Sequence, residues 1–498
     1  MTSIKEHYPA QYDVVIIGGG VSGCLIAYRL SGYDISVCLI EKEADLACGA
    51  TGANSAIVHS GYDPEPGTKK AHYNVSGNRM FGDLCRDLGV PFVQNGSLII
   101  AFNTQEHAKI EKLFERGTAN GVPGLKILTA TETLAMEPAV SNEVYSALYA
   151  PSGGIVCPYE LTFAASETAY NNGTQFLFET EVTAIHRDAS SGDSFTVTCR
   201  DRKSGNEEFM VKARTIVNAA GAFADKVSAM AGDDSFRIIP RRGEYSIVDK
   251  QIGKLVRHTI FQAPTEKGKG VLVTPAVDEN IIVGPNAQQV ESPDDTATTR
   301  EGREEIWGSA VKSVPALNRS FSIRDFAGIR ATPSTHDFII GEAPGIPGFY
   351  RAAGIESPGL TAAPAFSEDI GKLIIARLMP DHPKYREASV MTRKPPVRFR
   401  NLSPETQGEL IAQEPLYSNV ICRCENITEA EIVDAIRRTI GEVTVNGIKM
   451  RTRAGMGRCQ GGFCLPRVIS IIARETGRPA ESVTMAGAGS DIITGRTR

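Results

Sequence analysis

A glycine-rich turn near the start of the chain constrains the fold more than any other feature. Residues 12–17 (YDVVII) form a short apolar run, and residues 18–23 read Gly-Gly-Gly-Val-Ser-Gly. A helical-looking stretch then leads to a second apolar run, residues 35–40, which is followed directly by Glu41. This order of strand, glycine turn, helix, strand and acidic residue is the fingerprint of a dinucleotide-binding fold. The sequence therefore predicts an α/β protein built around a bound dinucleotide.

The residue types of this turn suit the task. Gly18 permits the tight turn, Gly20 lets a pyrophosphate approach the backbone, and Gly23 lets helix and strand pack closely. The N–H groups at the start of the following helix favour phosphates. Glu41, eighteen residues after Gly23, is placed to accept hydrogen bonds from a ribose.

Two later segments decide between NAD and FAD. Residues 215–221 (TIVNAAG) resemble the second flavoprotein motif, a strand that runs into small residues lying against the dinucleotide. Residues 348–360 (GFYRAAGIESPGL) resemble the returning strand and glycine turn that place backbone N–H groups against a flavin. Three separated segments that converge on one cofactor are typical of FAD-dependent oxidoreductases with the glutathione-reductase-like fold. We therefore expect FAD.

Over about residues 10–378 the resemblance becomes more specific. Five segments resemble, in order, the glycerol-3-phosphate oxidase and dehydrogenase group of the D-amino-acid-oxidase-like flavoproteins. They are TGANSAIVHSGY (51–62), GSLIIAF (96–102), RRGEY (241–245), PTEKGKGVLVTP (264–275) and AGIESPGLTAAP (353–364). L-2-hydroxyglutarate dehydrogenases share the element N-S-x-x-x-H-S/A-G, so that element alone does not name the substrate.

This resemblance implies a division of the chain. A FAD-binding Rossmann-like domain of the glutathione-reductase-like type is expected from about residues 10–85, 150–225 and 325–378, and an α+β substrate domain from residues 86–149 and 226–324. The residues expected to hold FAD are Gly18, Gly20, Val21, Ser22, Gly23, Glu41, Lys42, Thr51, Asn54, Ser55, Val182, Ala220, Gly221, Gly354, Pro358, Gly359, Leu360 and Thr361.

His59 is the candidate catalytic base. Oxidation of a secondary alcohol requires a base for the hydroxyl proton and an acceptor for the hydride, which is flavin N5. His59 follows the Asn54-Ser55 loop that the resemblance places along the flavin, and the family's catalytic histidine falls at this position. A histidine in an apolar stretch without such a context is more often a hydrogen-bonded core residue.

An anionic substrate must also be held in place over the flavin. Arg330, in FAGIRATPS, matches the family's substrate-anchoring arginine, and a guanidinium holds phosphate or carboxylate bidentately. Lys269 and Ser357 fall at further substrate positions of the family. Arg241 and Arg242 have two interpretations of equal weight, as pocket lining or as a salt bridge that orders a strand end.

Such a cationic pocket suits sn-glycerol 3-phosphate, L-2-hydroxyglutarate or another small anionic hydroxy compound. The RRGEY, KGKGV and GIESPGLT segments favour oxidation of sn-glycerol 3-phosphate to dihydroxyacetone phosphate. Three alternatives stay open at this point. They are an oxidase of the same substrate that forms hydrogen peroxide, a dehydrogenase of a 2-hydroxy acid, and a non-enzymatic assembly or iron-sensing module.

Four cysteines near the C-terminus predict a metal centre. Cys422 and Cys424 form a C-x-C pair, Cys459 and Cys464 form a C-x4-C pair, and 34 residues separate the pairs. Four thiolates saturate either one zinc ion or one 2Fe-2S cluster. The spacing resembles the bacterioferritin-associated-ferredoxin-like domain, which holds a 2Fe-2S cluster. The expected unit, residues 416–498, is small and helical, and a capping box at Thr428 and Glu431 is predicted to start one of its helices.

Between these parts, residues 379–415 carry several prolines and many charges, which predicts an extended linker lying on the flavin domain. The whole chain has 53 Lys and Arg against 58 Asp and Glu, with no basic run of five or six residues, so a nucleic-acid partner is not expected. Neither a signal peptide nor a transmembrane segment is evident. We expect a cytoplasmic enzyme that passes electrons to a redox partner subunit, a quinone or another acceptor. If it works at a membrane surface, we expect a partner to hold it there.

Overall fold

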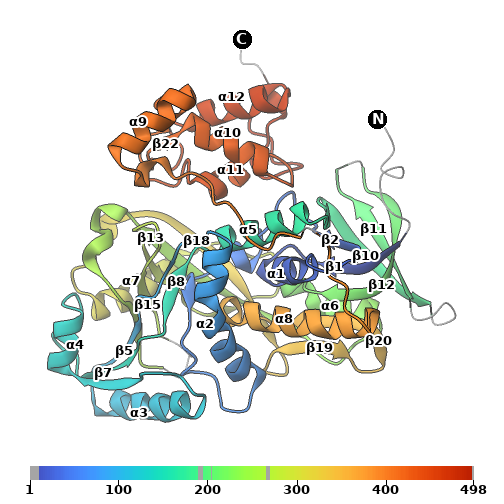
Figure 1. The fold of residues 1–498 in the computed structure, drawn as a ribbon. Helices are drawn as coiled ribbons and strands as arrows, with labels where there is room; N and C mark the ends of the chain where they lie inside the picture. Colours follow the sequence, from blue (N-terminus) through green and yellow to red (C-terminus); the bar gives the residue numbers. More distant parts are fainter. Residues whose placement is uncertain (1–10, 189–193, 204, 265–269, 388, 496–498) are drawn as a thin grey trace.

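Three structural units are present in the computed structural model (Figure 1), which describes residues 11–188, 194–203, 205–264, 270–387 and 389–495. Within these residues the first unit is built on an eight-stranded sheet and the second on a nine-stranded sheet. The third is a small helical unit near the C-terminus, drawn in orange and red. The chain is therefore mixed α/β with a helical C-terminal unit, as the sequence predicts.

The eight-stranded sheet carries the glycine turn. Its central strands run parallel in the order β2, β1, β12 and β20, and the Val and Ile side chains of β1 are buried on both faces. The strands are β1 (Gln11–Ile17), β2 (Val37–Ile40), β9 (Gln175–Leu177), β10 (Thr180–Asp188), β11 (Ser194–Asp201), β12 (Glu207–Asn218), β19 (Ile339–Ala343) and β20 (Ile346–Ala353).

Alternation along β1 divides the core of this unit into two layers. Val14 and Ile16 belong to the core that packs under the helices, whereas Val15 and Ile17 belong to the core under β10 and β11. Helix α1 packs against both α5 and α8, and α2 packs against α8. The helices are α1 (Val21–Leu30), α2 (Lys69–Asp87), α5 (Pro158–Asn171), α6 (Ala224–Met230) and α8 (Gly359–Leu378).

The nine-stranded sheet forms the second unit, and its core contains the single tryptophan of the chain, Trp307. Its indole N–H donates to Ser246 Oγ at 3.0 Å. The strands are β5 (Ser97–Ala101), β6 (Lys126–Thr129), β7 (Ser146–Ala150), β13 (Ile238–Val248), β14 (Thr259–Gln262), β15 (Leu272–Pro275), β16 (Ile281–Gly284), β17 (Gln288–Gln289) and β18 (Ser322–Pro333), and the helices are α3 (Thr104–Ala119), α4 (Ala130–Met136) and α7 (Arg300–Ser313).

The position of strand β18 does not match the expected boundary between the flavin domain and the substrate domain. It pairs along its length with β13, from Ser322 opposite Val248 to Pro333 opposite Ile238. The expected boundary at residue 325 would cut this strand, because a ladder of this length cannot be recognised from the residues of one strand alone. We place the boundary after residue 333 and otherwise keep the proposed division.

A short three-stranded sheet contains strands that lead into both units. It contains β3 (Ile57–Val58), β8 (Gly154–Val156) and β4 (Phe92–Val93). His59 follows β3 directly, so this sheet fixes the backbone that leads to the candidate base.

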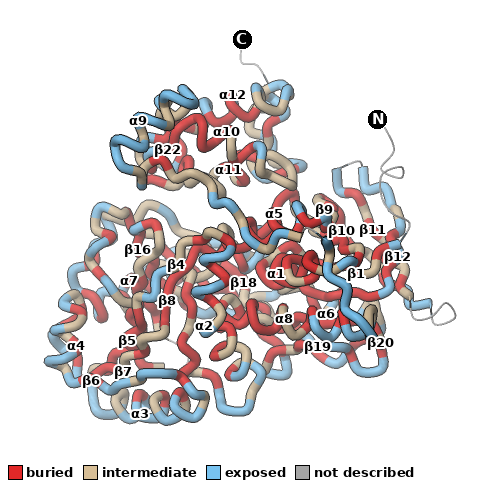
Figure 2. Tube along the Cα trace, in the orientation of Figure 1, coloured by how far each residue is buried: buried red, intermediate tan, exposed pale blue. Residues whose placement is uncertain are grey.

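The C-terminal unit has a core of its own, visible as the buried segments of α10 and α12 in Figure 2. Thr428 and Glu431 form the predicted capping box at the start of α10. The elements are β21 (Val420–Cys422), β22 (Ile427–Thr428), α10 (Glu429–Arg438), α11 (Val445–Thr452) and α12 (Leu465–Thr476).

The linker lies on the flavin unit from its start to Arg398, which pairs with Glu160 of α5. Tyr28 Oη donates to Met391 O at 2.8 Å, and Arg393 pairs with Glu167 at 2.6 Å. Residues 404–413 instead form helix α9 (Pro404–Gln413), capped by Ser403, so the expectation of an extended segment is wrong there. The Ser-Pro-Glu start is a helix N-terminus signal that the many charges obscured.

A buried ion network joins all three units. Asp278 of the second unit pairs with Arg453 of the C-terminal unit at 3.0 Å and with Arg400 of the linker at 2.6 Å. Arg398 pairs with Asp278 and with Glu160 of α5. Burial works to raise the pKa of Asp278, but these arginines hold it below its ordinary value. The C-terminal unit is thus fixed against the rest of the chain by ion pairs that salt screens little, because they are buried.

Candidate active site

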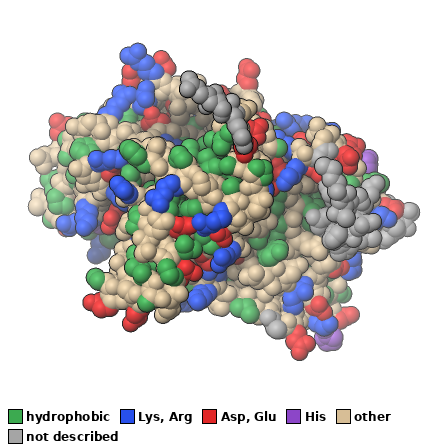
Figure 3. Space-filling view, turned by 90° about the horizontal axis from the view of Figure 1, so that it is seen from above, with side chains coloured by type: hydrophobic (Ala, Val, Ile, Leu, Met, Phe, Trp, Pro, Cys, Tyr) green, Lys and Arg blue, Asp and Glu red, His purple; other side chains and the backbone are tan. Residues whose placement is uncertain are grey.

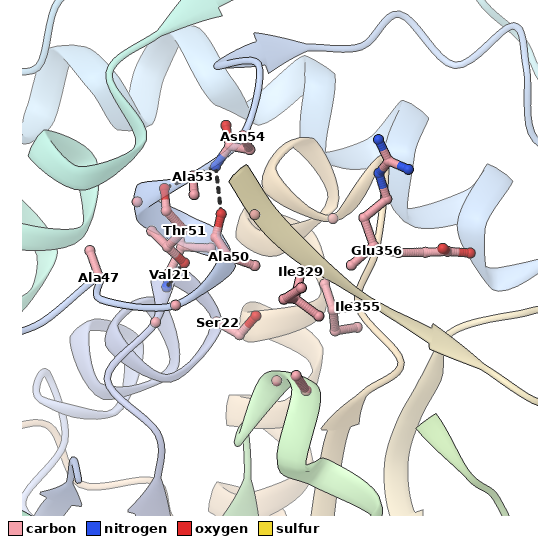
Figure 4. A pocket seen from close by; sticks show the side chains of 18 of the residues that line it. Val21, Ser22, Ala47, Ala50, Thr51, Ala53, Asn54, Ile329, Ile355 and Glu356 are labelled. Carbon is pink, nitrogen blue, oxygen red and sulfur yellow. Dashed lines mark hydrogen bonds between the residues drawn. The ribbon is translucent and has the colours of Figure 1, made fainter. Parts of the chain in front are cut away.

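A cavity of about 1200 Å³ lies where the glycine turn, the second sheet and the C-terminal unit meet. Figure 4 shows part of its wall, with Val21 and Ser22 from α1, Thr51 and Asn54 from the segment after β2, and Ile329 from β18. Its volume exceeds that of most small-molecule pockets, which suits a dinucleotide and a substrate together.

The glycine turn shows why glycine is required at two positions. Gly18 has φ +112°, and a Cβ there would lie 2.4 Å from Ala219 O. A Cβ at Gly23 would lie 2.0 Å from Gly18 O. Glu41 accepts from Gly19 N at 2.6 Å, so its carboxylate braces the turn as well as lining the cavity.

Most residues expected to hold the dinucleotide line the cavity. Gly23, Gly354 and Thr361 do not, because they lie behind its wall. The residues that do are Gly18, Gly20, Val21, Ser22, Glu41, Lys42, Thr51, Asn54, Ser55, Val182, Ala220, Gly221, Pro358, Gly359 and Leu360.

His59 is held from both sides of its backbone. Its N–H donates to the buried Thr361 Oγ1 at 2.8 Å, and its carbonyl accepts from Asn78 Nδ2 at 3.1 Å. The imidazole lines the cavity, with Nε2 3.3 Å from Ser357 Oγ. The ring of Phe261 lies 5.9 Å away, centroid to centroid. The structure therefore brings together His59 and Ser357, which are 298 residues apart.

Arg330 lines the same cavity from β18. Its Nη2 donates to Asn286 O at 2.9 Å, which fixes the guanidinium. Gly243, on the neighbouring strand β13, makes room for it, since a Cβ there would lie 2.5 Å from Nη2. This contact explains the glycine of the RRGEY segment.

Of the two interpretations that the sequence left open, pocket lining fits Arg241 and a structural salt bridge fits Arg242. Arg241 lines the cavity. Arg242 is buried and pairs with Asp295 at 2.7 Å, so it is the structural member. Lys269 lies outside the described residues, whereas Gly270, which follows it, lines the cavity.

The sequence analysis did not predict an ion pair in the cavity wall, between Lys70 and Glu356. Lys70 Nζ lies 2.7 Å from Glu356 Oε1, and Thr332 Oγ1 donates to Glu356 Oε2 at 2.6 Å. Burial works to raise the pKa of Glu356, but Lys70 and Thr332 hold it below its ordinary value. Glu356 stands next to Ser357 in the IESPG segment, and this position was the signal that could have pointed to it. Its partner Lys70 lies 286 residues away.

The four terminal cysteines form two close pairs. Cys424 Sγ lies 3.6 Å from Cys459 Sγ, and the Cys422 thiol is hydrogen-bonded to that of Cys464. Two thiolates on one tetrahedral metal, with bonds of about 2.3 Å, lie roughly 3.8 Å apart. In the described part of the chain no three ligating side chains converge on one point. The pairing fits a 2Fe-2S cluster, in which each iron takes two cysteines.

The surroundings favour the thiolate at two of the four cysteines, Cys422 and Cys459, whereas burial raises the pKa of Cys424 and the hydrogen bond with Cys422 raises that of Cys464. The Cys464 thiol and the backbone N–H groups of Gly455 and Glu425 lower the pKa of Cys422 to about 6. Burial works to raise the pKa of Cys459, but N–H groups of residues 461–463 lower it below its ordinary value. The C-x4-C loop, with Gly461 and Gly462, thus turns backbone donors toward the sulfur of Cys459.

Comparison with known proteins supplies the family. The profile described as FAD dependent oxidoreductase matches residues 13–373, well over half of the chain. The chain belongs to the family of FAD-dependent oxidoreductases. The profile described as BFD-like [2Fe-2S] binding domain matches residues 420–474, so this oxidoreductase carries a 2Fe-2S-binding domain behind its flavin unit.

Individual relatives cover most of the oxidoreductase. A glycerol 3-phosphate dehydrogenase of Caloramator mitchellensis is 44% identical over 490 residues, which are 98% of this chain and 99% of that protein. An L-2-hydroxyglutarate dehydrogenase of Escherichia coli K12 is 32% identical over 281 residues, 55% of this chain and 64% of that protein. The solved FAD-bound L-alpha-glycerophosphate oxidase from Mycoplasma pneumoniae aligns with a TM-score of 0.72 and 33% identity, over 78% of this chain and 99% of that one.

The cavity of the oxidoreductase fits FAD on its own geometry. The N-cap residue of α1, Gly20, has no side chain to cap the helix, although Val21 N–H donates to Thr51 Oγ1 at 3.0 Å, and nothing lies within 4 Å of a Cβ built at Gly221. The C-terminal unit completes the wall with Thr444, Asn446, Gly447, Met450 and Ala486.

Among the described residues, no helix is both long enough and apolar enough to cross a bilayer.

Proposed function

We propose that this oxidoreductase oxidises sn-glycerol 3-phosphate to dihydroxyacetone phosphate and passes the electrons to a separate acceptor. The observation that carries the proposal is the placement of His59, Ser357 and Arg330 around one cavity. When bound, FAD supplies a hydride acceptor, and the 2Fe-2S cluster supplies one-electron transfer. The relatives named glycerol 3-phosphate dehydrogenase and L-alpha-glycerophosphate oxidase support the substrate.

Each side chain has a task in this reaction. Arg330, with Arg241 beside it, binds the phosphate bidentately and so fixes the carbon that loses hydride. Nε2 of His59 accepts the hydroxyl proton, and Ser357 orients the substrate hydroxyl or the imidazole. Lys269 is proposed as a further phosphate ligand. His59 takes the hydroxyl proton of the alcohol, and bound FAD would accept the hydride from the same carbon, so that the product is the ketone.

We further propose that the residues named above as lining the cavity hold FAD, with Gly23, Gly354 and Thr361 supporting them. Cys422, Cys424, Cys459 and Cys464 are proposed as the four ligands of the cluster. Through a partner, the chain would operate at a membrane surface, while the chain itself stays in the cytoplasm.

A continuous line of contacts supports a role for the cluster in turnover. Tyr159 lines the cavity, and its hydroxyl lies 3.8 Å from Met456 Sδ. Gly457 packs directly on Cys424, because a Cβ there would lie 2.2 Å from Cys424 Cβ. The cavity wall and a proposed ligand are therefore connected through Tyr159, Met456 and Gly457.

Anaerobic titration tests the proposal. Addition of sn-glycerol 3-phosphate is expected to bleach the flavin absorbance, and paramagnetic resonance is then expected to show a reduced cluster. Bleaching by L-2-hydroxyglutarate alone would overturn the substrate. Rapid peroxide formation in air without reduction of dye or quinone would identify an oxidase instead.

A further inference from the structure

Phe463 is the most exposed of the large hydrophobic side chains in the described ranges, with 85% of its surface accessible. It lies inside the C-x4-C loop, directly before Cys464. A single exposed apolar residue is ordinary, but aromatic side chains are enriched in the cores of protein interfaces. Its position beside a redox centre gives its exposure a specific use.

Exposed arginines flank the same site. Arg423 stands between Cys422 and Cys424 and is exposed, and Arg467 is exposed one turn after Cys464 on α12. The guanidinium of Arg467 donates to Val420 O at 3.3 Å and Asn419 Oδ1 at 2.8 Å, so it crosses to β21 without losing its charge to a carboxylate. Phe463, Arg423 and Arg467 are called the cluster-edge patch below.

The acidic groups near this patch are buried or already paired. Glu425 is 1% exposed and pairs with Arg400 at 3.0 Å and with Arg453 at 2.9 Å. Glu429 is 5% exposed and pairs with Arg474 at 2.6 Å. Arg458, exposed before Cys459, pairs with Asp249 at 2.9 Å. The charge that reaches solvent at the cluster edge is therefore positive.

The C-terminal unit as a whole repeats this asymmetry. Residues 416–498 contain twelve Lys and Arg against eight Asp and Glu, while the whole chain has 53 against 58. A basic unit is thus mounted on an acidic body. Figure 3 views the molecule from the side of this unit and shows Lys and Arg side chains in blue, Asp and Glu in red and hydrophobic side chains in green on this face.

We propose that the cluster-edge patch is the docking surface of an acidic one-electron carrier protein. This inference rests on the proposed function, since it assumes that electrons leave through the cysteine site. Phe463 forms the apolar centre of the interface, and Arg423 and Arg467 form its charged rim. One electron passes per encounter, so two oxidised carriers are reduced for each alcohol oxidised. The repulsion between an acidic carrier and the body of the enzyme directs the carrier to this edge.

Acceptor preference tests the proposal with the complete enzyme. Plastocyanin, an acidic blue-copper protein, and mitochondrial cytochrome c, a basic haem protein, are offered as acceptors under substrate at low salt. We expect plastocyanin to be reduced faster, with a rate that falls steeply as salt rises. Arg423→Glu with Arg467→Glu is expected to slow plastocyanin by ~10-fold or more and to favour cytochrome c. Phe463→Ser is expected to slow plastocyanin without changing its salt dependence.

Matched measurements separate docking from damage. Arg437→Glu alters an arginine of α10 whose side chain is 72% exposed, and is expected to leave acceptor rates unchanged. Iron, sulfide, flavin bleaching and dye reduction are expected to stay at wild-type levels in every variant. Equal effects of Arg437→Glu and of the patch variants, or no effect of the patch variants, would overturn the proposal.

Two further outcomes have a definite meaning. Binding to vesicles of anionic phospholipid that requires Phe463, without any effect on acceptor rates, would identify a membrane contact instead and overturn the proposal. If sn-glycerol 3-phosphate fails to reduce the flavin, dithionite-reduced enzyme serves as the donor. A retained preference for plastocyanin then supports the docking surface although the proposed substrate is wrong.

Discussion

Arg451 of the C-terminal unit holds Asp45 of the flavin unit bidentately, with Nη1 and Nη2 at 2.5 and 2.8 Å from the two carboxylate oxygens. Both side chains are less than a tenth exposed. The guanidinium also stacks 4.0 Å from the ring centroid of Phe163, which lines the cavity. One side chain therefore ties the cluster-binding unit to the wall of the flavin cavity.

Arg451→Met is expected to loosen this attachment. Removing one partner of a buried pair leaves a desolvated charge and costs about 3–5 kcal/mol. Electron transfer to cluster-dependent acceptors is expected to fall while substrate still bleaches the flavin. Urea unfolding and acceptor assays measure the two effects. Lys372→Met breaks the exposed pair with Glu368 and is expected to cost at most about 1 kcal/mol. Similar losses in both variants would refute a special role for Arg451.

His59→Ala is expected to slow flavin reduction by sn-glycerol 3-phosphate by ~10²-fold or more, because the hydroxyl proton loses its acceptor. FAD is expected to stay bound, since the imidazole points into the cavity while the backbone makes the structural contacts. Stopped-flow absorbance gives the rate and the protein-bound flavin spectrum gives the occupancy. Joint loss of FAD and activity would indicate a structural histidine. His107→Ala, which alters a histidine of α3 bonded to Ser146, serves as the control.

Gly243→Ala probes the seat of Arg330. The added Cβ would lie 2.5 Å from Nη2 and must push the guanidinium aside. We expect the KM for the phosphorylated substrate to rise ~10-fold, which corresponds to about 1.4 kcal/mol, with a smaller change in kcat. Gly308→Ala on α7 meets nothing within 4 Å and serves as the matched control. An unchanged KM in Gly243→Ala would show that Arg330 does not anchor the substrate.

Gly457→Ala probes the cysteine site. Its Cβ would lie 2.2 Å from Cys424 Cβ, so the C-x-C segment must move and one thiol pair must open. We expect iron and acid-labile sulfide to fall from ~2 each per chain while FAD content holds. Metal analysis of Gly408→Ala, whose Cβ meets nothing within 4 Å, gives the baseline. One zinc per chain without sulfide in the parent enzyme would contradict the cluster itself.

The Lys70–Glu356 pair predicts a pH dependence. The pKa of Glu356 is lower in the folded chain than in the unfolded one, so its ionisation stabilises the fold fully above about pH 4.3. That contribution is lost as the pH falls through the lower folded pKa. Glu356→Gln is expected to be less stable than the parent at pH 7, with a gap that narrows below pH 4. Urea midpoints at both pH values test this, and a gap independent of pH would contradict it.

The features that the sequence predicted well are local. The glycine turn and the Thr428–Glu431 capping box depend on residues a few positions apart, so their spacing determines their geometry. The cysteine pairs were recognisable because thiolates in such a pattern have few other uses.

The features that escaped prediction depend on distant partners. The place of β18 is set by its ladder with β13, some 80 residues earlier. Arg241 and Arg242 differ only in which side of β13 they project from, and Lys70 meets Glu356 across 286 residues. The sequence shows which residues are charged but not which of them will pair, because the folded state brings the partners together.

The wall contributed by Thr444, Asn446 and Met450 sets an order of events during synthesis. Translation delivers the N-terminal units first, so the flavin cavity stands open on that side until the last eighty or so residues have emerged and folded. FAD that binds before that point lacks the contacts with Thr444, Asn446 and Met450, so its binding site is complete only when the C-terminal unit has folded.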